Sequence, residues 1–285
     1  MLKNHNQQIY KLKRAQQILK ILKHKGFEAF IVGGAVRDFC LNIPLTDIDI
    51  TTNATSQNIK NIFSLKMKNN KYGSHKIIFE KEIFDITTYR KEGSYLDHRH
   101  PSFVEFINDV KQDILRRDFT INGLLMNEEN HIIDYIKGKD DLLKGLIRAI
   151  ANPDQKFKED ALRIIKLFYL QAKLNFSIEK NTYQAIFANV CFLKKLNSQD
   201  LFREIKKMLK QPYVYQAFVS MVRTKAVNFL NGLKPCILFI IKNKIFNLNQ
   251  ELFLNISFTL DPNFGQKFFL NREEKKMLKH LSWCS

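Results

Sequence analysis

The chain has 285 residues, of which 45% are hydrophobic and 26% are charged, and its formal net charge is +18. This length and apolar content indicate a globular protein with one large or two ordinary domains. Residues 1–150 carry 24 basic and 18 acidic side chains, whereas residues 151–285 carry 22 and 10. Because positive charge favours a nucleic acid or an anionic membrane surface as partner, the C-terminal half is the stronger candidate for binding a polyanion.

The cysteines and the apolar runs exclude other classes of protein. The cysteines are far apart, without a C-x-x-C pair or a histidine at ligand spacing, so they predict neither a zinc site nor a disulfide framework. The N-terminal sequence lacks the apolar core of a signal peptide, and the longest apolar run is too short to span a bilayer. We therefore expect a soluble cytoplasmic protein with reduced thiols at Cys40, Cys191, Cys236 and Cys284.

The first predicted elements are an amphipathic helix from Gln7 to Lys25 and a strand from Phe27 to Val32. Gly33 and Gly34 follow the strand, and a helix is expected immediately after them. Glycine adopts positive φ without steric cost, so this turn lets backbone N–H groups approach a triphosphate closely. A Gly-Gly pair by itself is more often only a turn.

Two aspartates occur on the next predicted strand, from Leu45 to Thr52. Alternation along a strand places Asp47 and Asp49 on one face and Ile48 and Ile50 on the opposite, core-facing side. The two carboxylates repel each other, and a pair of Mg²⁺ ions about 3.5–4 Å apart would neutralise them and catalyse displacement at phosphorus. A lone D-x-D is usually a solvated strand edge, but its position after the Gly-Gly turn favours the metal interpretation.

A short helix from Gln57 to Phe63, capped by Ser56, precedes two strands, Lys76–Phe79 and Ile83–Tyr89. Asp85 on the second strand is either a third carboxylate near the metal or an exposed strand acid, and the sequence leaves both interpretations open.

Residues 91–102 have turn formers and charge without periodicity, which predicts a mobile loop. Its histidines, His98 and His100, more often face solvent in such a loop than bind a metal.

A helix from Val110 to Asp118 leads into the sequence RRDFTIN. Arg117 can hold a triphosphate while Asp118 and Asn122 hydrogen-bond ribose hydroxyls. The alternative is a surface ion-pair cluster of little energetic weight. Residues 132–136 and a helix at 140–146 complete the first domain, 1–150, and Asn152-Pro153 marks its boundary with the second domain, 151–285.

The second domain has helical periodicity nearly to its end, and its sequence shows no clear pattern of paired strands or hairpins. Its first helix, residues 157–176, places Asp160 three residues before Arg163. An aspartate acceptor beside an arginine donor complements the base edge that cytosine and adenine share and that uracil and guanine lack. The same residues could instead form an ordinary helix ion-pair set of about 0.2–0.5 kcal/mol per pair.

Six motifs in this order, GGxVRD, LxDxD, FDITTYR, RRDFTIN, IxDYxxGxxDLxxxxIR and FxEDALRxxK, run from Gly33 to Lys166. Together they resemble the motif set of the class II tRNA nucleotidyltransferase and poly(A) polymerase family. The resemblance implies an α+β fold, with a polymerase-β-like head that contains a mixed β-sheet, followed by an all-α neck, body and tail that hold tRNA. It also implies an enzyme that adds CCA to tRNA 3′ ends from CTP and ATP with Mg²⁺.

The resemblance also assigns roles to individual residues. Asp47 and Asp49 would be the catalytic metal ligands, Asp160 and Arg163 the template for base choice, and residues 91–102 the flexible loop associated with the final A addition. The nucleotide-binding residues would be Gly33, Gly34, Arg37, Arg117, Asp118, Asn122, Asp160, Arg163 and Lys166.

Several positions depart from the family pattern. Lys166 replaces a usual arginine and lacks the planar bidentate geometry. The usual Asp-Gly of the loop is Asp97-His98, and Gly123 replaces the alanine of RRDFTINA. The helical part is also shorter than in typical relatives, which predicts a reduced or missing tail.

Two other functions are compatible with these motifs. A poly(A) polymerase, or a tRNA enzyme that adds only CC or only A, would share the head motifs, although the retained loop argues against CC addition alone. An inactive basic RNA-binding protein would not be expected to keep Asp47, Asp49, Asp118, Asp160 and Arg163 at working spacing.

Overall fold

The computed structural model describes residues 2–63, 72–230, 232–268, 270 and 274. Contacts between Cα atoms divide the chain into two compact units. The first unit consists of Met1–Ser94, Pro101–Lys144 and Arg148–Ala151, and the second consists of Tyr95–His100, Gly145–Ile147 and Asn152–Ser285.

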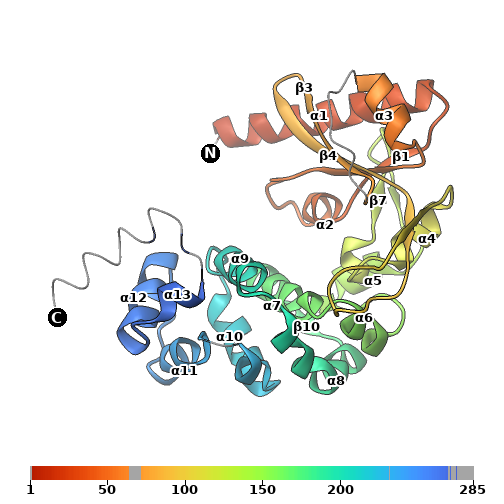
Figure 1. Ribbon diagram of the computed structural model, residues 1–285. Helices are drawn as coiled ribbons and strands as arrows, with labels where there is room; N and C mark the ends of the chain where they lie inside the picture. The colour runs from red at the N-terminus through yellow and green to blue at the C-terminus, as the bar shows by residue number, and fades with distance from the viewer. Residues whose placement is uncertain (1, 64–71, 231, 269, 271–273, 275–285) are drawn as a thin grey trace. The chain divides into compact units, whose positions relative to one another are not determined.

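The first unit is built on a six-stranded mixed sheet with the strand order β3-β4-β2-β1-β7-β8 (Figure 1). Strands β2 and β4 are parallel, and the other neighbouring strands are antiparallel. The expected mixed sheet is therefore confirmed. The strands are β1 Ala29–Val32, β2 Asp49–Thr52, β3 Ser74–Phe79, β4 Glu82–Thr88, β7 Leu125–Met126 and β8 Ile132–Ile133.

Helices and a separate hairpin complete the first unit. The expected opening helix is present, and it contacts β1 with a fully buried apolar stripe that includes Ile18 and Leu22. The helices are α1 Leu2–His24, α2 Gly34–Cys40, α3 Ser56–Phe63, α4 Val110–Leu115, η1 Thr120–Asn122 and α5 Gly138–Leu143, and the hairpin pairs β5 Arg90–Glu92 with β6 Val104–Phe106.

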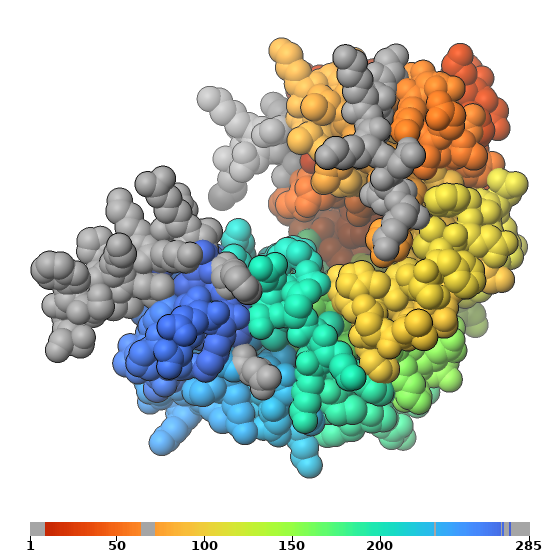
Figure 2. Space-filling model, viewed as in Figure 1, coloured from red at the N-terminus to blue at the C-terminus, as the bar shows by residue number. Residues whose placement is uncertain are grey.

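The second unit is helical, as the periodicity predicts, and its described residues from 152 onward run from green to blue in Figure 2. Half of the phenylalanines described in it are buried in the core, and Phe168, Phe218 and Phe253 are fully buried. The helices are α6 Pro153–Glu159, α7 Leu162–Leu174, α8 Lys180–Asn189, η2 Val190–Lys195, α9 Ser198–Met208, α10 Val214–Arg223, η3 Ala226–Phe229, α11 Lys234–Lys242, α12 Gln250–Leu260 and α13 Phe264–Lys267.

One strand pair in this unit was not expected. Strand β9, Leu146–Ile147, lies parallel to β10, Ser177–Ile178. With two residues in each strand there is no alternation to detect in the sequence. The pairing is extended by the N–H of Glu179, which donates to Ile147 O at 3.0 Å.

Several helix boundaries differ from the expectation: α1 begins at Leu2 instead of Gln7, and the helix predicted at 140–146 spans Gly138–Leu143. The helix predicted across residues 157–176 is broken at Asp160, whose extended backbone separates α6 from α7. The carboxylate of Asp160 accepts the N–H of Leu162 at 2.9 Å, so it competes with continued helix formation. Helix α4 ends at Leu115 rather than Asp118. Thr55, not Ser56, caps α3, because its Oγ1 accepts the N–H of Asn58 at 3.2 Å.

Within the described ranges, no helix is long and apolar enough to cross a bilayer. Cys40, Cys191 and Cys236 are free thiols, whereas Cys284 lies outside the described residues.

Candidate active site

The Gly-Gly turn and the two aspartates meet at the ends of β1 and β2. The antiparallel register pairs Val32 with Asp49, so Gly33, the next residue after β1, lies beside the Asp49 side chain. A Cβ atom added to Gly33 would lie 3.6 Å from Asp49 Oδ2. The backbone of Gly33 has φ 80° and ψ −141°, a conformation that glycine adopts readily and other residues avoid.

The predicted alternation holds along this segment. Asp47 and Asp49 are exposed, whereas Ile48 and Ile50 are buried in the core. Asp47 lies just before β2 rather than within it. The two carboxylates therefore belong to the accessible face of the sheet, where a ligand can reach them.

Asp85 is adjacent to this pair but already has a cationic partner. Parallel pairing of β2 with β4 sets Asp85 opposite Asp49, and Lys76 Nζ on β3 lies 3.1 Å from Asp85 Oδ2. In the part of the chain that the structure describes, no three His, Cys, Asp or Glu residues form a group that could hold a metal ion. The geometry thus gives Asp85 an ion pair with Lys76 beside Asp49, and its role as a third metal ligand stays a prediction.

The electrostatics around Asp49 suit a cation. Removal of water by the surrounding protein raises the pKa of Asp49, Arg117 opposes this rise, and the neighbouring carboxylates of Asp85 and Asp47 add to it. A divalent cation would relieve this repulsion, and carboxylate oxygens are the donors that Mg²⁺ prefers. Asp47 and Asp49 therefore fit a metal. Asp47, but not Asp49, lines a cleft of about 370 Å³, together with Lys11, Ile48, Lys76, Lys81, Glu82, Ile83 and Asp85.

Arg37 lies inside the first unit instead of at its surface. Its side chain is 4% exposed, and its Nε and Nη2 donate to Asp38 Oδ1 at 2.9 and 2.8 Å. Its Nη1 donates to Asn122 Oδ1 at 2.6 Å. This burial favours a positioning role for Arg37 over the direct nucleotide contact that the family motif implies.

Asn122 connects Arg37 to Asp118 in the RRDFTIN segment by hydrogen bonds. Its Nδ2 donates to Asp118 Oδ1 at 3.2 Å, and the same oxygen accepts the N–H of Phe119 at 2.8 Å. One chain of hydrogen bonds thus runs from helix α2 through Arg37 and Asn122 to Asp118. The structure brings these predicted residues together and holds Asp118 in a defined orientation.

Asp113 is a site-supporting residue that the sequence analysis missed. It is fully buried, and it accepts hydrogen bonds from Arg116 Nε at 2.8 Å, Arg117 Nη2 at 2.9 Å and Thr51 Oγ1 at 3.1 Å. Burial alone would raise the pKa of Asp113, but Arg117 and Arg116 outweigh it and lower the pKa to about 2. The spacing of three and four residues before the two arginines is the signal that could have identified it.

In the second unit, Arg163 on α7 is buried and held by residues of the preceding helix, α6. Its Nη1 donates to Glu159 Oε2 at 2.8 Å and to Lys156 O at 2.9 Å. Its guanidinium carbon lies 5.8 Å from the centre of the Tyr95 ring. Glu159, at the end of α6, therefore fixes the predicted donor. Lys166, also on α7, is half-buried.

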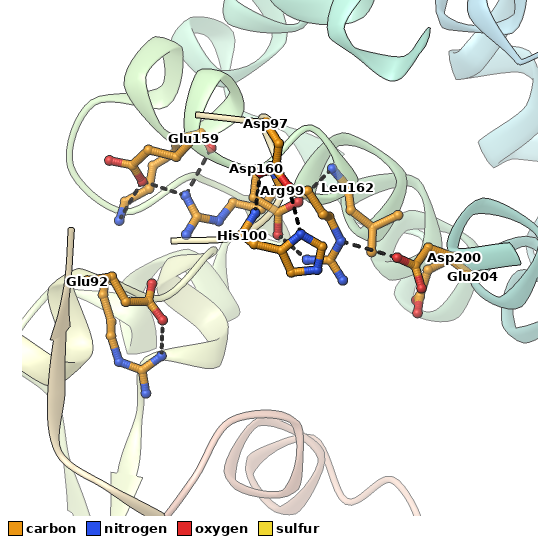
Figure 3. A network of polar contacts seen from close by, with 12 residues as sticks. Glu92, Asp97, Arg99, His100, Glu159, Asp160, Leu162, Asp200 and Glu204 are labelled. Atoms are coloured by element: carbon orange, nitrogen blue, oxygen red, sulfur yellow. Dashed lines mark hydrogen bonds and ion pairs between the residues drawn. The ribbon is translucent and has the colours of Figure 1, made fainter. Parts of the chain in front are cut away.

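Asp160 is buried as well, and both oxygens of its carboxylate accept from groups other than the Arg163 guanidinium. Its Oδ1 accepts the Leu162 N–H, and its Oδ2 accepts Arg99 Nη1 at 3.1 Å (Figure 3). Arg99 was not singled out from the sequence, because a loop residue and a helix residue 61 positions apart show no spacing signal.

The segment predicted as an irregular loop has defined contacts. Ser102 N–H donates to Ser94 O at 2.8 Å, and residues 95–100 belong to the second unit. His100 is exposed, as expected, whereas His98 is half-buried, and its ring stacks on Phe192 at 4.0 Å between centroids. A partner in a distant helix explains why local composition did not predict this.

Comparisons with known proteins agree with these features. The family model described as "Poly A polymerase head domain" matches residues 29–148, and that described as "Probable RNA and SrmB- binding site of polymerase A" matches residues 175–236. A CCA-adding enzyme of Staphylococcus saprophyticus subsp. saprophyticus is 33% identical over 267 residues, which cover 92% of this chain and 67% of that enzyme. The chain belongs to the class II tRNA nucleotidyltransferase and poly(A) polymerase family.

Other relatives in this family differ in length. A CCA-adding enzyme of Staphylococcus epidermidis is 38% identical over 218 residues, covering 76% of this chain and 54% of that enzyme. The chain thus spans about half the length of that relative.

Solved structures of CCA-adding enzymes share the fold. The Bacillus stearothermophilus enzyme in complex with CTP superimposes with a TM-score of 0.72 at 28% identity, over 80% of this chain and 56% of that one. The Thermotoga maritima enzyme complexed with tRNA gives a TM-score of 0.70 at 21% identity, over 96% and 69% of the two chains. These likenesses agree with the α+β assignment.

Proposed function

We propose that this chain is a template-independent RNA nucleotidyltransferase that adds CCA to the 3′ ends of tRNA from CTP and ATP and releases pyrophosphate. The observation that carries the proposal is the pair of exposed carboxylates, Asp47 and Asp49, beside the Gly33 turn in a member of this family. Relatives over most of the chain are CCA-adding enzymes, and solved neighbours are complexes with CTP, ATP or tRNA.

Asp47 and Asp49 would hold the divalent cations, for which Mg²⁺ is the expected species. When bound, such ions lower the pKa of the attacking 3′-hydroxyl and neutralise charge on the leaving pyrophosphate. The chain's own contribution is to keep two carboxylates on one face through the strand register of β2. The Lys76 ion pair keeps the charge of Asp85 from adding fully to theirs.

Arg117, Asp118 and Asn122 would bind the phosphates and sugar of the nucleotide. Asp113 fixes the guanidinium of Arg117. The positive charge of Arg117 acts on Asp49, where it opposes the rise in pKa that burial causes. Asp118, oriented by Asn122, offers carboxylate oxygen to a ribose hydroxyl. The backbone N–H groups of the Gly33 turn would contact phosphate oxygens.

Base choice would come from the second unit. Asp160 would accept a hydrogen bond from the exocyclic amino group of cytosine or adenine, and Arg163 would donate to the adjacent ring nitrogen. Uracil presents O4 and N3–H in these places, so each mismatch leaves a desolvated polar group that costs about 1–3 kcal/mol. Glu159 supports this role because it fixes Arg163 in one orientation.

The two parts of the chain would divide the work. Residues 1–150 form the catalytic head in this proposal, and residues 151–285 form a helical neck and body that binds RNA. The larger excess of basic side chains in residues 151–285, 22 against 10 acidic, supports RNA binding there.

The experiment supplies tRNA that ends before CCA, before CA and before A, adds one labelled nucleotide at a time with Mg²⁺, and sequences the products. We expect C, C and A to be added in turn and addition to stop. Asp49→Asn serves as the inactive control. Long A tails would instead identify a poly(A) polymerase, the second candidate favoured by the description of the matched head domain. Products with only CC or only A would identify a partial enzyme, and no product would contradict the proposal.

A further inference from the structure

The tip of the segment between β5 and β6, residues 97–100, is a tightly built turn. Asp97 Oδ1 accepts the N–H groups of Arg99 at 2.9 Å and His100 at 2.7 Å. Asp97 Oδ2 also accepts from His100 Nδ1 at 2.8 Å. These bonds fix the direction in which the Arg99 side chain leaves the backbone.

His98 attaches this turn to the helices of the second unit. Its Nδ1 donates to Lys158 O at 2.6 Å, and its carbonyl accepts the Ala161 N–H at 3.0 Å. The His98 and Phe192 rings stack with an interplanar angle of 20°. His98 has φ 59°, the left-handed conformation that the glycine usual at this position of the family would adopt without cost. This chain therefore accepts a strained backbone and gains two contacts from the imidazole, the bond to Lys158 O and the stacking on Phe192.

These contacts bring the Arg99 side chain to the carboxylate of Asp160, the residue proposed to select the base. Its Nη1 donates to Asp160 Oδ2 at 3.1 Å, and its Nε lies 3.5 Å from Asp200 Oδ2 (Figure 3). The Arg99 side chain is 23% exposed, and Asp160 is 8% exposed. Since Leu162 N–H takes Asp160 Oδ1, both oxygens of the carboxylate already have donors.

We propose that Arg99 is an internal substitute for the nucleobase. It is hydrogen-bonded to the Asp160 carboxylate until CTP or ATP displaces it, and the contacts of His98 position it there. This inference rests on the proposed function, in which Asp160 accepts the amino group of the base. A guanidinium N–H and an exocyclic amino N–H are both donors, so they compete for the same buried oxygen. Only a base with the amino group that cytosine and adenine share beside a ring nitrogen acceptor restores the hydrogen bond that displacement of Arg99 breaks.

Competition of this kind has a measurable consequence. The apparent Kd of a ligand equals its intrinsic Kd divided by the fraction of protein in the competent state. If Arg99 occupies Asp160 for about nine-tenths of the time, its removal lowers the apparent Kd for CTP about tenfold. A residue that merely anchors the loop would leave the Kd unchanged or raise it.

The test is equilibrium binding of CTP, ATP and UTP to the full chain with Mg²⁺ and without tRNA. Arg99→Ala should bind CTP and ATP roughly five- to tenfold more tightly. Arg99→Lys, which keeps the charge, should lie between it and the unmodified chain. His98→Gly should change affinity in the same direction by a smaller factor. It removes the imidazole contacts that position the turn, but it keeps the Arg99 side chain.

Arg203→Ala is the matched control. Arg203 Nη2 lies 2.5 Å from Asp200 Oδ1, but no described contact joins Arg203 to Asp160, so CTP affinity should not change. In an Asp160→Asn background, Arg99→Ala should give little or no gain, because the competing carboxylate is gone. Thermal unfolding of each variant verifies that it is folded.

The outcomes separate the two proposals. If the unmodified chain binds CTP and ATP in preference to UTP but Arg99→Ala binds them equally or less tightly, the inference about Arg99 is wrong and the proposed function stands. A gain that persists in the Asp160→Asn background also contradicts it. If the unmodified chain binds none of the three nucleotides, the proposed function itself fails.

Discussion

The two units present their candidate groups in opposite ways. In the first unit the candidate carboxylates, Asp47 and Asp49, are exposed, and the polar residues that support the site, such as Asp113, are buried. In the second unit the candidate groups themselves, Asp160 and Arg163, are buried and already hydrogen-bonded to protein. A cation can therefore reach the first pair without moving any protein group, whereas a base can reach the second pair only by exchanging partners. The following predictions test this contrast.

The largest effect is expected at the exposed carboxylates. Asp49→Asn keeps the shape of the side chain but removes the charge that would hold a cation, so nucleotide incorporation should fall at least about a thousandfold, equivalent to about 4 kcal/mol. Asp85→Asn on the adjacent strand is the matched control, and it should cost less than about tenfold because Lys76 pairs with Asp85. The measurement is single-turnover incorporation with Mg²⁺. Equal losses in both variants would mean that the two acids share one role.

The buried support of the first unit should govern stability. Asp113→Asn leaves Arg116 and Arg117 without their shared carboxylate, and breaking such a buried pair should lower the free energy of unfolding by about 3 kcal/mol. The midpoint of urea unfolding measures this change. The exposed Asp47→Asn variant should leave the midpoint within about 0.5 kcal/mol of the original value. A similar midpoint for both variants would contradict the division between exposed site and buried support.

The same residue predicts a pH dependence. Because its pKa is lowered from 3.8 to about 2, the charged form of Asp113 contributes on the order of 2 kcal/mol of stability above pH 4. That contribution is lost as the pH falls from about 4 to 2, since the unfolded chain takes up the proton first. Unfolding free energies measured across this range should converge for the original chain and Asp113→Asn. Parallel curves would show that Asp113 does not titrate in this way.

A change of base choice is the corresponding test for the second unit. Asp160→Asn presents an amide donor to uracil O4, so the ratio of UTP to CTP incorporation on tRNA lacking CCA should rise about tenfold or more, about 1.4 kcal/mol. Arg163→Ala should raise the same ratio by a smaller factor. Glu159 is left unchanged in both variants, because it holds the Arg163 guanidinium in the original chain. An unchanged ratio in both variants would make these residues an ordinary ion-pair set.

The smallest effect is expected for alanine substitutions at Gly26 and Gly33, which compare backbone strain alone with strain beside the proposed site. Gly26 and Gly33 have φ angles of 83° and 80°, so alanine at either position should cost about 1 kcal/mol of stability. Only at Gly33 would the new Cβ lie beside Asp49, whereas nothing lies within 4 Å of a Cβ at Gly26. Gly33→Ala should therefore also reduce incorporation, and Gly26→Ala should not. Equal activity in the two variants would remove the Gly33 turn from the proposed site.

Local patterns predicted the first unit well for a physical reason. The alternation of Asp47, Ile48, Asp49 and Ile50 is set by the strand geometry, which neighbouring residues in the sequence fully determine. The exposure of the two acids and their position beside Gly33 could therefore be anticipated. The inward position of Arg37 could not, because its acceptor on Asn122 lies 85 residues away.

In the second unit, sequence patterns identified the helices but not the partners. The apolar periodicity is a local property, so helices α6 to α12 were expected in outline. The break at Asp160 and the occupation of its carboxylate by Arg99 depend on a capping bond and a distant loop. Asp160 and Arg163 looked like a mutual pair in the sequence, yet each is bonded to other residues in the structure.

The capping bond of Asp160 also limits how the specificity of this chain can be engineered. One oxygen of Asp160 is needed to start helix α7 at Leu162, and the same side chain is the proposed reader of the base. Side chains that keep an N-cap oxygen, such as Asn, Ser and Thr, preserve the helix start, whereas aliphatic residues lose about 1 kcal/mol there. A library aimed at new nucleotide preferences should therefore vary position 160 only among small oxygen-bearing side chains and explore larger changes at Arg99, where no helix begins.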